Sequence, residues 1–336
     1  MRVFITGAAG FIGFHLARRL LDEGHEVAGY DNLNAYYEPQ LKRDRLAILQ
    51  QYPGFSMDVA DLADAAALGE AYRRFSPDHV VNLAAQAGVR HSLEAPQDYV
   101  SANLVGFANL LECCRAQKPA HLLFASTSSI YGASRKLPYG ESDIAEHQLN
   151  LYAASKKANE AMAHAYSHLY DIPATGLRFF TVYGEWGRPD MAFFKFANAI
   201  MRGRPIDIYN EGHMSRDFTY VGDIVEGMMQ VLGKPPQPDP GWRAEAPAPG
   251  TSGVAPYTVY NIGNGQPVSL MRYIEVLEDC LGRKARCNYL PMQPGDVRDT
   301  SADVGKLQAA TGYRPKTSVE EGLKAFADWY LDYYGM

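Results

Sequence analysis

Residues Arg2–Gly13 read RVFITGAAGFIG, a short apolar run followed at once by glycines at positions 7, 10 and 13. The apolar run predicts a buried strand, and apolar residues at helical spacing over Phe11–Glu23 predict a helix directly after it. Glycines in such a turn allow a sharp reversal, close approach of the backbone to a pyrophosphate, and tight helix–strand packing. The free N–H groups and the dipole at the start of the helix favour phosphate. The stretch therefore predicts a dinucleotide-binding turn.

The rest of the first half repeats this alternation of apolar runs and helical patterns. Further buried-strand runs are Glu26–Tyr30, His79–Ala84, His121–Ala125 and Ala174–Phe180. Continuous apolar strands that alternate with helices predict an α/β fold, a doubly wound parallel sheet of the Rossmann type with helices on both faces. After about residue 180 the pattern becomes irregular, which predicts a smaller, mixed α/β domain for the substrate.

These patterns divide the chain into two domains. We expect residues 1–178 to bind the nucleotide cofactor, with later segments near 215–232 and 257–265 returning to that domain. Residues 179–214 and 266–336 are expected to form the substrate-binding domain. Gly233–Pro256 is crowded with proline and glycine and is expected to be a surface loop insertion.

The composition excludes several classes of partner. The chain has 336 residues, of which 47% are hydrophobic and 21% charged, as in ordinary globular proteins. A net charge of −6 predicts no binding of nucleic acid or anionic lipid, and no apolar stretch is long enough to span a membrane. The four cysteines show neither metal-ligand spacing nor a disulfide framework. We therefore expect a cytoplasmic protein without a metal site.

Asp31 follows the second expected strand, where an acidic side chain can accept hydrogen bonds from the ribose hydroxyls of a dinucleotide. Its charge would repel a 2′-phosphate, so the residue favours NAD over NADP. The alternative is that Asp31 and Asn32 only turn the chain at the end of the strand.

Tyr152 and Lys156 lie four residues apart, hence on one face of a helix. In a chain with 22 tyrosines such a pair arises by chance, so its position matters: it follows the last-but-one expected strand and the hydroxyl run Ser126–Ser129. A tyrosine, with a free pKa of about 10, becomes a useful base only where positive charge favours the phenolate. We expect Lys156 and a nicotinamide ring to provide that charge. The alternative is a half-buried aromatic residue on an amphipathic helix.

The motifs TGAAGFIG at Thr6–Gly13 and YAASK at Tyr152–Lys156 resemble the extended branch of the short-chain dehydrogenase/reductase family. Longer segments resemble its NAD-dependent sugar-nucleotide epimerases, above all the UDP-glucuronate 4-epimerases. These segments are Tyr30–Tyr37, Ala84–Ser92, Arg178–Met191 and Tyr209–Val221. The resemblance covers essentially the whole chain outside residues 233–256.

The resemblance implies an NAD site and a catalytic set. The implied cofactor-binding residues are Gly7, Gly10, Phe11, Ile12, Gly13, Asp31, Asn32, Asp58, Val59, Leu83, Ala84, Ala85 and Lys156. Thr127 matches the family's catalytic Ser/Thr and joins Tyr152 and Lys156, although the sequence leaves open which of Thr127, Ser128 and Ser129 contacts the reacting hydroxyl. Asn103 matches a structural asparagine. Related dehydratases and decarboxylases have a carboxylate near Thr127–Ser129, where this chain has none, so epimerisation is favoured over elimination.

The same resemblance implies a substrate site for a UDP-hexuronic acid. Bidentate pairing would let Arg188 hold the sugar carboxylate, with donors from Thr181, Ser128 and Ser129. For the UDP moiety the implied residues are Arg216 and Arg298 at the diphosphate, Tyr209 at the uracil, and Asp296 beside Arg298 or at a ribose. Arg90 would face the sugar or the cofactor. Alternatively, Arg188 and Arg90 are solvated surface arginines.

We therefore expect an NAD-dependent 4-epimerase that converts UDP-glucuronate to UDP-galacturonate through a 4-keto intermediate, with Tyr152 removing and returning a proton. One alternative is a UDP-glucose or N-acetylhexosamine 4-epimerase of the same family. Another is a non-catalytic NAD-binding regulatory protein, which would not need Thr127, Tyr152 and Lys156 together. A homodimer is expected, with helices over Ser101–Cys114 and Tyr152–Tyr166 at its interface.

Overall fold

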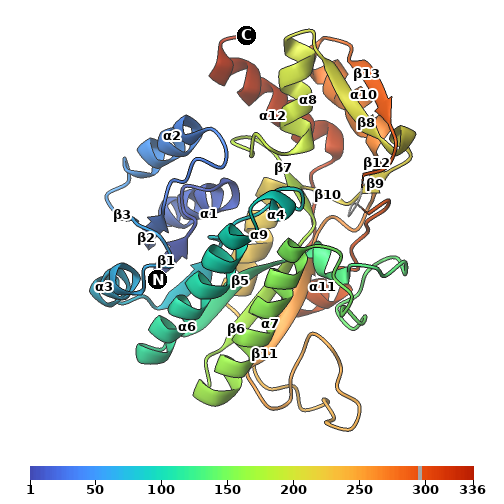
Figure 1. The fold of residues 1–336 in the computed structure, drawn as a ribbon. Helices are drawn as coiled ribbons and strands as arrows, with labels where there is room; N and C mark the ends of the chain where they lie inside the picture. The colour runs from blue at the N-terminus through green and yellow to red at the C-terminus, as the bar shows by residue number, and fades with distance from the viewer. Residues whose placement is uncertain (294–296) are drawn as a thin grey trace.

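A seven-stranded parallel sheet is the centre of the computed structural model, which describes residues 1–293 and 297–336 (Figure 1). Its strands are β1 (Arg2–Thr6), β2 (Glu26–Asp31), β3 (Phe55–Val59), β4 (His79–Asn82), β5 (His121–Thr127), β6 (Ala174–Phe179) and β11 (Tyr257–Ile262). They lie in the order β11-β6-β5-β4-β1-β2-β3, and every neighbouring pair is parallel. The expected doubly wound sheet is confirmed.

The order of the strands reverses at β1, which has β2 on one side and β4 on the other. Ligands of such sheets bind at the carboxyl ends of the strands on either side of this switch point. The glycine turn after β1 lies there. Because β2 and β5 end at Asp31 and Thr127, two of the expected site residues also lie at this edge.

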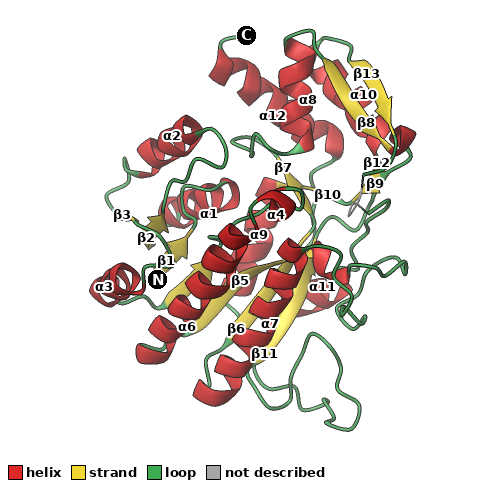
Figure 2. Cartoon of the chain, in the orientation of Figure 1, coloured by secondary structure: helices red, strands yellow, loops and turns green. Residues whose placement is uncertain are grey.

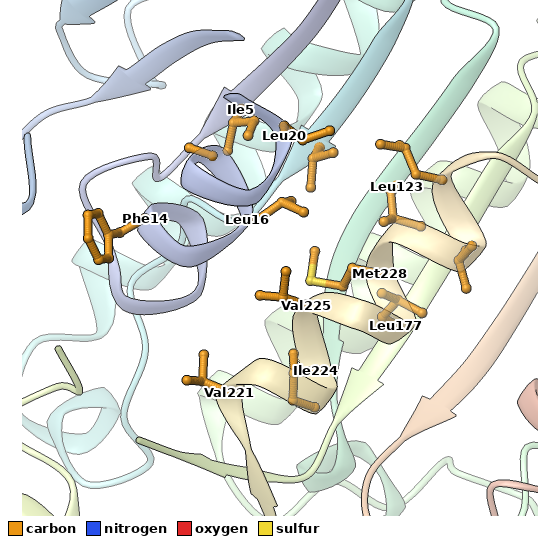
Figure 3. Packing of buried hydrophobic residues seen from close by; sticks show 14 of the residues in the cluster. Ile5, Phe14, Leu16, Leu20, Leu123, Leu177, Val221, Ile224, Val225 and Met228 are labelled. Carbon is orange, nitrogen blue, oxygen red and sulfur yellow. The ribbon is translucent and has the colours of Figure 1, made fainter. Parts of the chain in front are cut away.

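Helices cover both faces of the sheet (Figure 2). One face packs against α1 (Phe11–Asp22), α2 (Pro39–Leu49), α9 (Val221–Leu232) and α11 (Gly305–Thr311), and the other against α3 (Ala65–Phe75), α6 (Gly106–Ala116) and α7 (Leu151–Tyr170). Side chains of β1 alternate between the two cores, with Val3 and Ile5 in one and Phe4 in the other. Figure 3 shows the first core, where Leu16 and Leu20 of α1 face Met228 of α9. Among the described residues no helix is both long and apolar enough to cross a membrane.

A second, smaller part of the molecule, called the second half below, lies beyond the carboxyl edge of the sheet (Figure 1). It does not include α9, β11 and α11, which pack with the sheet. It contains α8 (Ala192–Met201), α10 (Leu270–Leu281), α12 (Val319–Tyr334), and the parallel pair β8 (Pro205–Tyr209) and β13 (Arg286–Leu290). Two small pairs join the halves: β7 (Thr181–Tyr183) with β10 (Phe218–Tyr220), and β9 (Ser215–Arg216) with β12 (Val268–Ser269). Short helical turns are α4 (His91–Glu94), α5 (Pro96–Tyr99), a π-helix (Val100–Val105), and 3₁₀ turns at Ser128–Tyr131 and Asn210–Gly212. An aromatic core that includes Phe194, Phe326 and Tyr330 stabilises this half.

The segment 233–256 differs from the expected surface loop at its C-terminal end. Ser252 and Ala255 are buried, and Thr251 forms an antiparallel bridge to Thr258 of β11. Lys306 donates from Nζ to the Gly250 carbonyl at 2.7 Å. β11 is the outermost strand of the sheet, so the residues that precede it pack beside it and satisfy its edge. Residues 233–251 are exposed or partly exposed, and the segment packs against the sheet only at its end.

Candidate active site

A cavity of about 1110 Å³ lies between the carboxyl edge of the sheet and the second half of the molecule. Predicted site residues that line it are Gly7, Gly10, Phe11, Ile12, Gly13, Asp31, Asn32, Leu83, Ala84, Ala85, Arg90, Thr127, Ser128, Ser129, Tyr152, Lys156, Thr181, Arg188, Tyr209 and Arg216. The structure thus brings most of the predicted cofactor, catalytic and substrate residues to one place.

The turn between β1 and α1 needs glycine at two positions. Gly7 has a φ of +74°, and a Cβ there would lie 2.7 Å from the Ala84 nitrogen. A Cβ on Gly13 would lie 2.1 Å from the Gly7 carbonyl oxygen. The turn can therefore pack directly on the strand end after β4 and open the start of α1 to the cavity. The first turn of α1 has no acidic residue, so it suits a phosphate group.

Asp31 is buried at the end of β2, where its carboxylate accepts backbone hydrogen bonds from Ala9 at 3.2 Å and Leu33 at 2.9 Å. Burial raises the pKa of Asp31, while these N–H donors and Lys42 act in the opposite direction. Asn32 donates from Nδ2 to Asp61 at 2.9 Å. Asp31 is therefore more than a chain-turning residue, because it ties the glycine turn to the wall of the cavity.

Asp58 and Val59 are not among the residues that line this cavity. Asp58 forms hydrogen bonds with Arg74 of α3 at 2.5 and 2.6 Å, and Val59 is largely exposed. The next residues, Ala60, Asp61 and Leu62, line the cavity instead. The cofactor role of the Asp58–Val59 pair stays a prediction, and the structure places its neighbours closer to the site.

Thr127 and Tyr152, which the sequence predicts to be catalytic, both line the cavity and are joined by a hydrogen bond. Burial raises the pKa of the Tyr152 phenol, while a hydrogen bond with Thr127 and the charge of Arg188 lower it. Lys156 is also buried, and burial lowers the pKa of its ammonium to about 8 despite the charge of Glu160. The sequence predicted Lys156 as the cation acting on Tyr152. In the structure the cation that acts on Tyr152 is Arg188, an influence that sequence reasoning missed, and the action of Lys156 on Tyr152 stays a prediction.

The start of α7 is held in place by two asparagines. Asn150 caps the helix by accepting a hydrogen bond from the Ala153 N–H at 2.8 Å. Asn103, within the π-helix, exchanges hydrogen bonds with the Gln86 backbone and donates to Ser155 Oγ at 2.9 Å. This clamp fixes the helix that presents Tyr152 against the strand end that lines the cavity.

Arg188 lies between α8 and β7 and is mostly buried. Its guanidinium donates from Nε to Asp190 Oδ1 at 3.0 Å and from Nη2 to Oδ2 at 2.5 Å. Its side chain is 23% exposed, which excludes the alternative of a solvated loop arginine. Thr181, at the start of β7, lines the same cavity and a smaller one of about 120 Å³ that also contacts Ser128 and Ser129.

The predicted UDP-binding residues are less completely assembled. Arg90 lies over the Tyr209 ring at 5.0 Å, so these two residues close one side of the cavity. Arg216 donates to the backbone carbonyls of Ser215 and Arg298. The Arg298 side chain is 69% exposed, pairs with Asp299 and does not line the cavity. Asp296 lies outside the described residues.

Sequence reasoning missed several polar residues in the cavity wall, among them Tyr36 and Asp190. Both lie inside segments that had been singled out, YDNLNAYY and RFFTVYGEWGRPDM. A carboxylate two residues from a predicted carboxylate-binding arginine was a signal that could have identified Asp190.

The fold and the cavity are those of a dinucleotide-binding enzyme, and comparisons with known proteins agree. A profile of the NAD dependent epimerase/dehydratase family matches residues 3–268, and the chain belongs to this family. A probable UDP-glucuronate 4-epimerase of Rhizobium meliloti (strain 1021) is 54% identical over 334 residues, which span 99% of this chain and 98% of the relative.

Solved structures are similar over the whole chain. The UDP-glucuronic acid 4-epimerase of Bacillus cereus, in complex with UDP-glucuronic acid and NAD, has a TM-score of 0.88 and 31% identity, covering 99% of this chain and 100% of the other. The UDP-glucose 4-epimerase of Thermus thermophilus, in complex with NAD, has a TM-score of 0.84 and 31% identity, with 98% and 99% covered.

Proposed function

We propose that this protein is an NAD-dependent epimerase that inverts carbon 4 of a UDP-hexuronic acid, converting UDP-glucuronate to UDP-galacturonate. The observation that supports the acidic sugar is the position of Arg188. It lines the cavity that contains Tyr152, and its charge acts on the Tyr152 phenol. The high identity to a relative named as a UDP-glucuronate 4-epimerase supports the same substrate.

The cofactor end of the cavity fits NAD. Gly7 and Gly13 leave space that a Cβ would fill, and Asp31 places a carboxylate at the end of β2. These residues would hold the pyrophosphate and the adenine ribose of NAD, which, when bound, accepts a hydride and later returns it.

The chain's own residues handle the proton and the orientation of the sugar. Tyr152, with Thr127 beside it, takes the proton of the carbon-4 hydroxyl and returns it after the 4-keto sugar has turned about its bond to the diphosphate. Since the proton is returned, the reaction needs no external base. The 4-keto uronic acid is a β-keto acid that can lose carbon dioxide. Arg188 and Thr181 would hold its carboxylate away from the alignment that cleavage requires.

The test is NMR of the product formed from UDP-glucuronate by purified protein with no added cofactor. UDP-galacturonate is expected, and extraction should release NAD(H) from the protein. If NADP is extracted, the role of Asp31 is wrong. If UDP-glucose is epimerised more efficiently than UDP-glucuronate, the neutral-sugar function is correct and the acidic substrate is rejected.

We also propose a homodimer that meets through α6 and α7. These helices lie side by side on the outer face of the sheet (Figure 1), and Leu169 and Tyr170 of α7 are 66% and 41% exposed. Light scattering should give twice the chain mass. The four free cysteines suit the reducing cytoplasm, which we propose as the location.

The division into a cofactor domain and a substrate domain is likewise proposed. It is supported by the return of α9 and β11 to the sheet.

A further inference from the structure

The Arg188–Asp190 ion pair uses only one edge of the guanidinium. A guanidinium has five N–H donors in a planar fork, and each of two edges can bind a carboxylate with two parallel hydrogen bonds. Asp190 accepts from Nε and from one N–H of Nη2. The distal edge, formed by Nη1 and the second N–H of Nη2, lies outside this pair. Arg188 lines the cavity, and the distal edge is the one that its pair with Asp190 leaves for a ligand carboxylate.

Asp190 is held in place by its neighbours, so a ligand is not expected to displace it from Arg188. Its side chain is 19% exposed, and the Tyr36 hydroxyl lies 3.3 Å from Oδ2 while also contacting Arg188. Arg188 holds the pKa of the Asp190 carboxyl below its ordinary value despite burial, so the group stays ionised. A ligand that displaced Asp190 would leave a buried carboxylate without its cation, which is strongly unfavourable.

Tyr36 reaches Asp190 because of Gly88. This glycine has a φ of +106°, and a Cβ there would lie 2.4 Å from the Tyr36 hydroxyl. The Tyr36 ring also packs on His91, with ring centroids 4.8 Å apart. Three segments therefore meet at one corner of the cavity: the first supplies Tyr36, Gly88 of the second leaves room for its hydroxyl, and the third supplies both Arg188 and Asp190.

We propose that Asp190 is a positioning residue for acidic sugars. It binds the Nε–Nη2 edge of the Arg188 guanidinium and so orients the distal edge to bind the substrate carboxylate. The inference rests on the proposed function, because it assumes that Arg188 binds the carboxylate of a UDP-hexuronic acid. Asp190 contacts no substrate atom in this arrangement and acts through Arg188. It thereby contributes to the preference for uronic acids over neutral hexoses.

The test compares Asp190→Asn with wild type in the NAD-loaded protein. Asparagine keeps the size of the side chain but removes the charge, so Arg188 loses its ionic anchor. We expect the Kd and KM for UDP-glucuronate to rise by about tenfold, while kcat with this substrate and the Kd for UDP-glucose change by less than about threefold. Asp190→Glu should recover part of the loss, because it restores the charge.

Asp143→Asn is the matched control. Asp143 also pairs with a cation, Lys136, and its side chain is mostly buried, but it does not line the cavity. This variant should bind both sugar nucleotides as wild type does. If it shows the same selective loss as Asp190→Asn, the effect is not specific and the inference is overturned.

The remaining outcomes are decisive. Tighter binding of UDP-glucuronate by Asp190→Asn would show that Asp190 competes with the substrate and would overturn the inference. Equal losses for UDP-glucuronate and UDP-glucose, or no loss for either, would also overturn it, because Asp190 would then hold the loop or have no role. In those cases wild-type turnover of UDP-glucuronate leaves the proposed function standing. A wild-type protein that does not epimerise UDP-glucuronate overturns both.

Discussion

Two arginine–carboxylate pairs in this molecule have the same chemistry and different surroundings. Arg178 of β6 binds Glu160 of α7 at 2.9 and 3.0 Å, and its third nitrogen donates to the Tyr131 hydroxyl at 3.0 Å. These two side chains are only 1% and 5% exposed. Arg188 and Asp190 form a pair of hydrogen bonds of 3.0 and 2.5 Å, but this pair borders the cavity. The Arg178–Glu160 pair is buried on all sides and stabilises the fold. The Arg188–Asp190 pair borders the cavity, so its arginine can also bind a ligand.

Removal of the Tyr152 hydroxyl should have the largest effect on turnover. The effects of changing the two arginine–carboxylate pairs can be compared with it. Tyr152→Phe should reduce kcat by about 10²–10⁴-fold, because proton transfer loses its positioned acid and base. NAD content and the thermal unfolding temperature should stay near wild type. If the variant retains turnover within a few-fold of wild type, Tyr152 is not the base. The Arg188–Asp190 pair would then not lie beside the reacting group.

Glu160→Gln should break the closed pair and reduce stability. Arg178 would keep its charge in the interior without a counter-ion, which costs about 3–5 kcal/mol of the free energy of unfolding. Glu160 has its pKa lowered by Arg178, so in wild type this contribution is present above the ordinary carboxyl range and is lost as the pH falls through the depressed value. Urea unfolding of the NAD-saturated proteins at neutral pH measures the loss. Asp190→Asn should lose much less free energy of unfolding than Glu160→Gln. A larger loss in Asp190→Asn would contradict the distinction between the two pairs.

Arg188→Ala should affect the acidic substrate selectively. A charge-assisted bidentate contact contributes about 1.5–3 kcal/mol, so kcat/KM for UDP-glucuronate should fall by about tenfold or more. UDP-glucose turnover should fall less, because this substrate loses only the influence of the Arg188 charge on Tyr152, and UDP-pentose by-products should increase. Adding Asp190→Asn to this variant should cause no further loss, because Asp190 acts through Arg188. Equal losses on both sugars would instead assign Arg188 to the loop or the diphosphate, with Arg90 as the next residue to test.

Lys156 is a third buried cation near these pairs, and its titration gives the smallest expected effect. Burial lowers its pKa to about 8. The unfolded value is about 10.4, so between these pH values the unfolded chain binds more protons and stability rises with pH. Urea unfolding at pH 7 and 9 should show a gain of about 1 kcal/mol in wild type that is missing in Lys156→Met. Parallel behaviour of the two proteins would mean that Lys156 titrates normally.

The sequence predicted the parts of the site that depend on local backbone geometry. The glycine turn, the carboxyl ends of the strands and the Tyr152–Lys156 helix face follow from patterns within a few residues. β3 was not predicted, because FSMDV mixes polar and apolar residues at the edge of the sheet. The interaction of Asp58 with Arg74 and the position of Arg298 also escaped prediction. Such charged side chains are placed by partners on other elements, about which local patterns give no information.

The position of β11 in the sheet has a consequence for synthesis of the protein. β6 pairs with β5 on one side and with β11 on the other, and residues 180–256 separate β6 from β11 in the chain. Until residues 257–262 leave the ribosome, the outer edge of an apolar strand has no partner and can pair with another nascent chain. A truncation before residue 257 is therefore expected to aggregate rather than to yield a smaller nucleotide-binding protein. For the same reason, a fragment that contains only the predicted cofactor domain has to include β11 to be expressed in a folded form.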